Sequence, residues 1–154
     1  MGNTVLHRRL AADLSTAMIY ALLRLRVEVF VVEQGVPYQE LDGHDLERTT
    51  RHFWLAPDGA IEQAAATLRL LEPVDGQFRI GRICTARQAR RQGALRRLLQ
   101  AALAEVGDAA CVLDAQPYCV ELFGSFGFVV NGPEFTTDGI PHVPMRREAS
   151  ARVR

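Results

Sequence analysis

The sequence predicts one α/β (α+β) domain in which helices flank a mixed sheet, and three observations support this. The 154 residues are close to the commonest size of a single domain, and no linker-like stretch divides them. Segments with helical spacing alternate with short segments of strand character. The hydrophobic content of 48% is enough for a substantial core. We therefore expect residues 1–154 to form a single domain, with residues 148–154 frayed.

Two helices and a loop are predicted from the spacing of apolar residues and of turn formers. A long amphipathic helix follows Asp13, a plausible N-cap, because apolar residues recur over 14–29 at the spacing of one helical face. The same spacing predicts a second helix over 95–106. Residues 35–45, which follow the first helix, are rich in glycine, proline and aspartate, and this favours an ordered loop.

Three antiparallel strands are predicted at 51–56, 64–72 and 77–85, because the turn sequences PDG and PVDG separate them. In the third strand the apolar phase slips by one residue around Gly81 and Arg82, as a β-bulge would cause. Further elements are predicted in this order: a strand at 111–115, a helix at 117–126, a strand at 127–130, a turn at 131–139 and a strand at 140–147.

Composition argues against several classes of function. All eighteen basic residues are arginine, so the chain cannot supply the lysine of a Schiff base or of a P-loop. Eighteen acidic residues balance them, and the zero net charge argues against nucleic acid or an anionic membrane as a partner. No apolar run approaches 18 residues, so membrane insertion is not expected. Three cysteines without a CxxC pair predict neither disulfides nor a metal site, which favours a cytoplasmic setting.

The segment 87–103, RQARRQGALRRLLQAAL, raises the main functional question. From Gly76 to Ala104 the chain has seven arginines and no acidic residue, so the local field is positive. The order strand, arginines, Gly93, helix places the free N–H groups of the first helical turn at a sheet edge, where they can bind an anion. The residues alone leave two interpretations open: an ordinary solvated helix face, or a site for a pyrophosphate group.

Four segments carry a family resemblance. Residues 82–103 (RICTARQARRQGALRRLLQAAL) resemble the cofactor motif of the GNAT superfamily of N-acetyltransferases, (R/Q)-x-x-G-x-(G/A). Residues 113–130 (LDAQPYCVELFGSFGFVV) resemble the next motif, which ends in a GF pair. Residues 23–47 and 135–145 resemble the ends of the ElaA-like subgroup. The resemblance implies a GNAT-type, mostly antiparallel central sheet with a splayed, bulged strand and helices on both faces.

The resemblance also implies acetyl-CoA as the co-substrate and no metal. Arg90 and Gly93 fill the first and fourth motif positions, and Leu95 stands where glycine or alanine is usual. The main chain of the bulged strand is expected to pair with the pantetheine arm, and the amides around Gly93 to hold the pyrophosphate. The implied cofactor-binding residues are Ile83, Cys84, Thr85, Arg90, Arg91, Gln92, Gly93, Ala94, Leu95, Arg96 and Phe123.

The implied reaction is direct attack of a primary amine on the acetyl thioester in a ternary complex. A backbone N–H near Ile83 or Cys84 would stabilise the oxyanion. The tyrosine that protonates the departing thiolate in many family members is replaced by Phe123, which leaves Tyr118 as a candidate. A base must also take a proton from the amine. The candidate bases are Glu33, His142 and His52.

Some of these residues have alternative interpretations. Glu33 could instead pair with an arginine, and a histidine in a strand is more often structural. Asp42, His44 and Asp45 could bind a cationic acceptor, although Asp42 is also suited to forming a turn. Cys84 is expected to be a core residue rather than a nucleophile.

The leading hypothesis is therefore an acyl-CoA-dependent N-acetyltransferase that acts on a small-molecule or peptide amine. A GNAT-fold protein that binds acetyl-CoA with little turnover, a sensor or interaction module, is the alternative, and Leu95 and Phe123 motivate it. Nucleic-acid binding is disfavoured because the arginine segment lacks interleaved aromatic residues. Assembly into a homodimer is left open.

Overall fold

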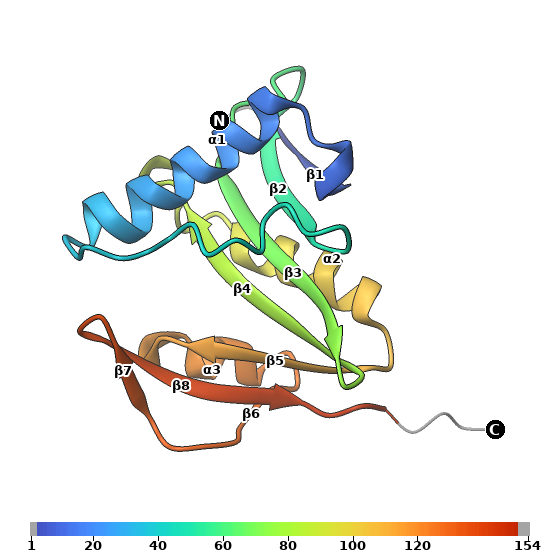
Figure 1. Ribbon diagram of the computed structural model, residues 1–154, viewed down its shortest axis with the longest axis vertical. Coiled ribbons are helices and arrows are strands. Elements are labelled where there is room, and N and C mark those ends of the chain that lie inside the picture. The colour runs from blue at the N-terminus through green and yellow to red at the C-terminus, as the bar shows by residue number, and fades with distance from the viewer. Residues whose placement is uncertain (1–2, 151–154) are drawn as a thin grey trace.

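The computed structural model describes residues 3–150 and confirms a mixed sheet covered by helices (Figure 1). The strands are β1 (Thr4–Leu10), β2 (Arg51–Pro57), β3 (Ala66–Val74), β4 (Gln77–Thr85), β5 (Ala110–Ala115), β6 (Val129–Val130), β7 (Phe135–Thr137) and β8 (Ile140–Arg147). The helices are α1 (Thr16–Val27), α2 (Ala94–Val106) and α3 (Val120–Gly124), with short helical turns η1 (Ala11–Asp13), η2 (Glu28–Glu33), η3 (Arg87–Ala89) and η4 (Pro117–Cys119). The sheet order is β1-β2-β3-β4-β5-β8-β6, and β7 pairs with β8. Among residues 3–150, only the β4–β5 pair is parallel.

Side chains alternate between the two faces of the sheet along its central strands, and helices bury both sets. In β2, Phe53 and Leu55 pack in the main core with α2, whereas Trp54 and Ala56 pack with Leu22 of α1. Figure 1 shows α1 crossing one face of the sheet and α2 and α3 against the other. The expected arrangement of helices on both faces is thus confirmed.

The third strand of the meander, β4, contains the β-bulge that the sequence predicts. Cys84 pairs with Thr67 and Gly81 with Arg69, so two residues of β4 lie opposite one residue of β3. Arg82, inside the bulge, has a φ of 51°, which is uncommon for a residue with a Cβ atom. The bulge shifts the side chains that follow it to the opposite faces of the sheet.

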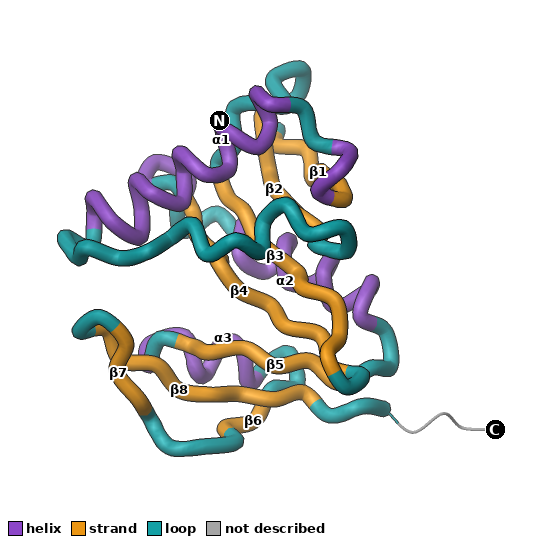
Figure 2. Tube along the Cα trace, viewed as in Figure 1, coloured by secondary structure: helices purple, strands orange, loops and turns teal. Residues whose placement is uncertain are grey.

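β4 and β5 pair over three residues only, Gln77–Arg79 opposite Ala110–Val112. Beyond these residues the two strands diverge, as Figures 1 and 2 show. From Gly81 onward, β4 therefore has no partner strand on this side within the described residues. Its free main-chain groups are available to bind another molecule.

The first helix differs from the prediction at both ends. Its N-cap is Ser15, not Asp13, because the Ser15 hydroxyl accepts a hydrogen bond from the Met18 N–H at 3.1 Å. Asp13 lies in the turn η1 instead. At the other end α1 continues into the π-helical turn η2, so the chain stays helical as far as Glu33.

The sequence pattern does not reveal β1 and β7. β1 is an edge strand whose sequence, TVLHRRL, lacks a clean alternation, and β7 is a three-residue strand inside the predicted turn at 131–139. Within the tail that is predicted to be frayed, residues 148–150 have no regular secondary structure, and the Ser150 N–H donates to the Asp108 carbonyl at 2.9 Å. Residues 151–154 of that tail lie outside the described residues.

Buried ion pairs hold the loop between η2 and β2, residues 34–50, against the sheet. Arg26 of α1, 1% exposed, pairs through Nη1 with Asp45 Oδ1 at 2.5 Å and through Nε with Glu40. Arg69 of β3 donates to both carboxylate oxygens of Asp42, at 2.9 and 2.8 Å. The complete ion-pair cluster consists of Arg26, Arg69, Arg82, Glu40, Asp42 and Asp45. Its three cations balance its three anions.

Replacing Arg26 by methionine is expected to lower the free energy of unfolding by about 3–5 kcal/mol, because the buried carboxylates of Glu40 and Asp45 each lose one of their two arginine partners. The control is Arg24→Met on the same helix, which removes an exposed ion pair with Glu28 and should cost less than about 1 kcal/mol. Urea denaturation measures both variants. Equal losses for the two would show that the buried pairs contribute no more than a surface pair.

Candidate active site

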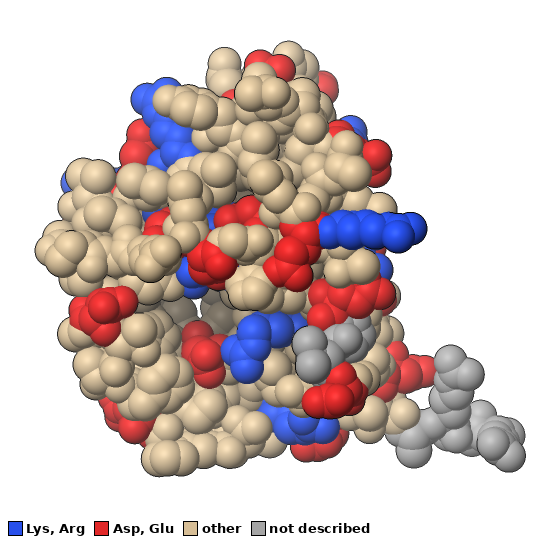
Figure 3. Space-filling model, in the orientation of Figure 1, with Lys and Arg blue, Asp and Glu red and all other residues tan. Residues whose placement is uncertain are grey.

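A cleft of about 760 Å³ opens where β4 and β5 diverge. Its residues come from β4, η2 and the loop 34–50 on one side, and from β5, η4, β7 and β8 on the other. Figure 3 shows a hollow on this face of the molecule, with acidic and basic side chains around its rim. The cleft follows directly from the short β4–β5 pairing, since continued pairing would bring the two walls together.

The N-terminus of α2 forms a smaller hollow of about 220 Å³ that adjoins the cleft, because Thr85, Arg90 and Leu95 line both. Gly93 is the N-cap and provides no side chain to cap the helix. The Arg97 N–H donates to the Gly93 carbonyl at 3.1 Å, which leaves the N–H groups of residues 94–96 without a partner inside the helix.

Backbone conformation prepares this hollow for an anion. Gly93 has a φ of 77° and Arg91 a φ of 64°, and left-handed residues in such a turn make successive amides converge. A Cβ atom at Gly93 would meet no heavy atom within 4 Å, so the space around it is open. Converging amides, a helix N-terminus and neighbouring arginines together fit the pyrophosphate of an acyl-CoA.

The arginines of this segment are less free than the sequence suggests. Glu33, at the end of η2, pairs with Arg90 at 2.8 Å and lies 4.0 Å from Arg87. The Arg96 guanidinium lies 5.7 Å from the centre of the Phe126 ring. The alternative interpretation of Glu33, pairing with an arginine, is therefore confirmed, because η2 brings Glu33 from a distant part of the chain to Arg90. The same pairing ties Glu33, a predicted base, to the end of the cleft that holds the predicted cofactor residues.

The unpaired edge of β4 supplies hydrogen-bond donors to the cleft. The Ala86 N–H donates to Ala65 at 2.7 Å, and Cys84 and Thr85 continue the regular register with β3. Because N–H groups along a strand alternate between its two sides, those of Ile83 and Thr85 face away from β3. Ile83, Cys84 and Thr85 all line the cleft, as predicted.

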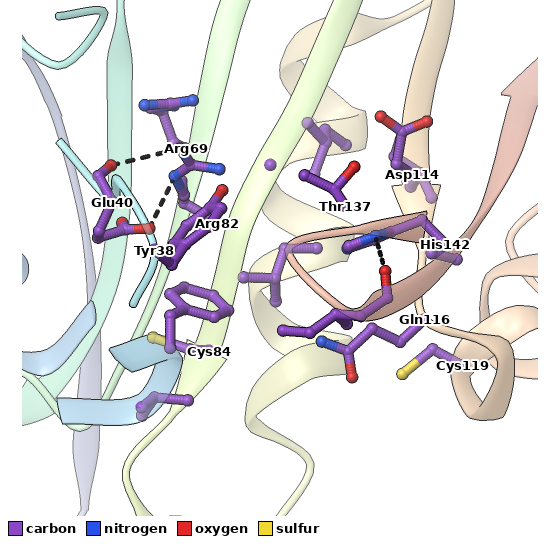
Figure 4. A pocket seen from close by; sticks show the side chains of 18 of the residues that line it. Tyr38, Glu40, Arg69, Arg82, Cys84, Asp114, Gln116, Cys119, Thr137 and His142 are labelled. Atoms are coloured by element: carbon purple, nitrogen blue, oxygen red, sulfur yellow. Dashed lines mark hydrogen bonds and ion pairs between the residues drawn. The ribbon is translucent and has the colours of Figure 1, made fainter. Parts of the chain in front are cut away.

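Two sets of side chains face each other across the rest of the cleft (Figure 4). One set consists of Tyr38, Glu40, Arg69 and Arg82, and the other of Asp114, Gln116, Thr137 and His142. Glu40 and both arginines belong to the ion-pair cluster, and Asp114 pairs with Arg79 at 3.2 Å. The charges on both walls are therefore largely neutralised within the protein.

His142 is held in one orientation on β8. Its Nδ1 lies 3.0 Å from the Ile140 carbonyl, and its ring stacks on Phe135 with the ring centres 5.6 Å apart. A carbonyl oxygen can only accept a hydrogen bond, so Nδ1 carries the hydrogen. In the neutral ring Nε2 then has the lone pair and can accept a proton.

The position of the usual tyrosine is an apolar site. Phe123 is 5% exposed and makes an edge-to-face contact with Phe128 at 6.1 Å. Tyr118 also lines the cleft, but it is 80% exposed. Cys119, one helical turn before Phe123, lines the cleft as well. The structure thus brings a hydroxyl to the cleft, although from the opposite end of the η4–α3 segment.

Several candidates from the sequence are structural. His52 is 1% exposed, does not line the cleft, and contacts the Asp45 carbonyl through Nε2 at 2.9 Å. Asp45 binds Arg26 and Arg69, so it is not available to a cationic acceptor. Asp42 forms the predicted turn by accepting from the His44 N–H, but it is also paired with arginine. Burial raises the pKa of the Cys84 thiol to about 12, consistent with its predicted place in the core.

The sequence pattern does not identify Tyr38, Glu40, Arg69 and Arg82 as parts of the site. The segment that contains Tyr38 and Glu40 is recognisable only as a loop. A signal exists in β3, where Arg69 interrupts the apolar run ATLRLL and must find a buried partner. The acidic residues of the following or preceding loops are the available partners, but the sequence does not say which ones.

The fold and the site together define an acyl-CoA-dependent transferase of the GNAT class. Residues 21–149 match the acetyltransferase (GNAT) domain family, and the chain belongs to that family. Its relatives include protein ElaA of Escherichia coli, which is 35% identical over 89% of this chain and 92% of ElaA. The prediction of an ElaA-like GNAT protein is confirmed.

More similar in sequence is the UPF0039 protein Rv2851c of Mycobacterium tuberculosis, 57% identical over 96% of both chains. Among solved structures, an acyl-CoA N-acyltransferase from Pseudomonas aeruginosa superposes with a TM-score of 0.85 and 42% identity, over 94% of this chain and 99% of that one. The crystal structure of E. coli ElaA gives a TM-score of 0.86 and 32% identity, over 95% and 100%.

Two properties can be stated for the part of the chain that the structure describes. No group of three or more His, Cys, Asp or Glu side chains there is arranged to hold a metal ion. None of the helices in this part has the length and apolar character needed to cross a membrane.

The ion-pair cluster predicts a pH-dependent stability. Burial opposes ionisation of Asp42, but hydrogen bonds from Arg69 and from the His44 N–H outweigh it and hold the pKa of Asp42 far below its usual value near 4. A lowered folded-state pKa stabilises the protein above the unfolded-state pKa, and this contribution is lost as the pH falls below it. Asp42→Asn is therefore expected to lower Tm at pH 7, with the difference from the unmodified protein shrinking below about pH 4. A Tm difference that is the same at pH 3 and pH 7 would contradict this.

Proposed function

We propose that this protein transfers an acetyl group from acetyl-CoA to a primary amine by direct attack in a ternary complex. One observation carries the proposal: the free amides of the first turn of α2 and the unpaired edge of β4 lie along adjoining hollows. A pyrophosphate at α2 would place the pantetheine arm along β4 and the thioester in the wider part of the cleft. The acyltransferase family of the chain supports the same assignment.

The main chain of β4 supplies the electrostatic part of catalysis in this proposal. Acetyl-CoA contributes an activated thioester when it is bound. The Ile83 N–H, which faces the cleft, would stabilise the negative charge that develops on the thioester oxygen. Because this donor belongs to a strand that is paired with β3 on its other side, it is already in place before the substrate binds.

His142 is the proposed base. Its Nε2 is free to accept a proton, and its orientation is set by the Ile140 carbonyl and by Phe135. Glu33 is less suited to this role because both of its oxygens contact Arg90. As the amine nitrogen bonds to the thioester carbon, its proton passes to His142 and the C–S bond breaks.

The departing thiolate does not depend on a protein acid. A thiolate with a pKa near 8.5 is a tolerable leaving group at neutral pH. Tyr118 could still donate its hydroxyl hydrogen, since it lines the cleft.

Phe123 favours a second candidate function, acetyl-CoA binding with little turnover, because it removes the usual hydroxyl. Release of CoA thiol with a panel of small amines, polyamines and peptides distinguishes the two: binding without release would favour the second.

Gly93→Val is expected to raise the Kd for acetyl-CoA by about 10- to 100-fold, the equivalent of losing one or two hydrogen bonds to charged groups. The physical reason is that a branched side chain would occupy the open space in front of the amides of α2. Isothermal titration calorimetry measures the change.

The matched control is Gly107→Val at the other end of the same helix. Gly107 also has a positive φ, 61°, and open space around it, and its ψ of −129° is less accessible to a residue with a Cβ atom than the left-handed conformation of Gly93. This variant is therefore expected to lose at least as much thermal stability as Gly93→Val and still to bind acetyl-CoA within about 2-fold of the unmodified protein. A Kd unchanged by Gly93→Val would exclude the pyrophosphate assignment.

His142→Asn is expected to lower kcat by about 100-fold or more, because asparagine can keep the hydrogen bond to Ile140 but cannot accept the amine proton. Since an imidazolium cannot act as a base, the acid limb of the pH–rate profile should also become less steep in the variant. The control is His7→Asn; His7 stacks on Trp54 at 5.3 Å and does not line the cleft. An unaltered pH–rate profile in His142→Asn would remove His142 as the base.

A further inference from the structure

The bulge in β4 decides which way Arg82 points. Ile80, before the bulge, and Ile83, after it, both pack in the main core with α2, whereas Cys84 packs on the α1 side. In a regular strand Arg82 would lie on the same face as Ile80, two residues away, and would enter that core. The bulge turns its side chain to the opposite face, toward the loop 34–50.

Arg82 makes four contacts with that loop. Its Nε lies 3.0 Å from Glu40 Oε2, and its Nη2 lies 3.2 Å from Asp42 Oδ2 and 3.3 Å from the Glu40 carbonyl. Its guanidinium also lies 5.1 Å from the centre of the Tyr38 ring, a cation–π contact. The side chain is 18% exposed and its partner Glu40 only 2%, so these contacts are shielded from solvent.

Arg82 differs from the other two arginines of the cluster in its backbone. Neither Arg26 in α1 nor Arg69 in β3 has a positive φ, whereas Arg82 does and is the residue directly before Ile83. A residue with a Cβ atom keeps such a φ only when surrounding contacts hold it there. The contacts that hold Arg82 come from the same loop that forms one wall of the cleft.

We propose that Arg82 is a positioning residue: its ion pairs with Glu40 and Asp42 hold the β-bulge so that the Ile83 N–H points at the thioester oxygen, and hold Tyr38 in the wall formed by the loop 34–50, against which the amine would bind. One side chain thus couples the oxyanion donor to this wall. The kinetic consequences of this inference rest on the proposed acyl transfer. The structural link between the bulge and the loop 34–50 is independent of that proposal.

The test distinguishes the contribution of the Arg82 ion pairs from that of the backbone conformation at position 82. Arg82→Gly removes the ion pairs while allowing the positive φ without strain. Arg82→Gly is expected to lower kcat by about 10- to 100-fold, because small displacements of a catalytic donor have effects of this size. It is also expected to raise KM for the amine, because the wall that contains Tyr38 is no longer held in place. The Kd for acetyl-CoA is expected to stay within about 3-fold, since the site at α2 is intact. Arg82→Lys, which keeps one charge contact, should retain more activity than Arg82→Gly.

The control is Arg51→Gly in β2. Arg51 is 17% exposed and bridges two carboxylates, Glu72 and Glu105, so it matches Arg82 in burial and number of ion pairs, but it does not line the cleft. It is expected to lower Tm at least as much as Arg82→Gly while leaving kcat and the amine KM unchanged. An equal kinetic loss in both variants would reduce the effect of Arg82 to general stability and overturn the proposal.

A second readout keeps the test independent of turnover. In ¹⁵N-labelled protein without substrate, the backbone amide resonances of Thr85 and Tyr38, neither of which is adjacent to the substituted residue in the chain, are expected to shift in Arg82→Gly and not in Arg51→Gly. Unshifted resonances, or unchanged kcat and amine KM, would overturn the role of Arg82. If the unmodified protein releases no thiol with any amine, the proposed function fails, and the amide shifts alone decide whether Arg82 links the bulge to the loop.

Discussion

The short pairing between β4 and β5 determines the rest of the site. Three residue pairs join these strands, and each strand is anchored on its other side, β4 by β3 and β5 by β8. The separation can therefore persist without unravelling the sheet. It leaves one edge of β4 free, opens a cleft of about 760 Å³, and places the start of α2 at its end. A ligand that pairs with a strand edge and ends in a phosphate group fits such a space.

Charge is distributed differently at the two ends of the cleft. At the N-terminus of α2 the positive potential comes mainly from backbone N–H groups and the helix dipole, because the Glu33 carboxylate neutralises the charge of Arg90. At the other end the ion-pair cluster neutralises itself, with three arginines against three carboxylates. The contribution of the cluster is to shape the wall, because buried ion pairs restrict a loop to one conformation, whereas apolar contacts alone would tolerate several.

The bulge illustrates how a local irregularity can serve several purposes. The phase slip between Ile80 and Ile83 keeps both side chains in the core, and it releases Arg82 from that core toward the loop. The same irregularity turns the main chain that follows toward the cleft. A few consecutive residues of β4 therefore serve both the fold and the proposed chemistry, and the segment that resembles the GNAT cofactor motif begins there.

The spacing of apolar residues was sufficient to predict α2 and the bulge, because these patterns depend on which side chains must be buried. The turn sequences PDG and PVDG were sufficient to predict the three-stranded meander, because turn formers act locally. The arginine–glycine turn was recognisable for the same kind of reason, since a glycine N-cap and unpaired amides are local properties. Contacts between distant segments determine the pairing of Glu33 with Arg90 and the composition of the ion-pair cluster. They also place Tyr38 and His142 on opposite walls of one cleft. No local pattern encodes such contacts, so only the tertiary structure decided which charged residues are buried partners and which side chains remain available to a substrate.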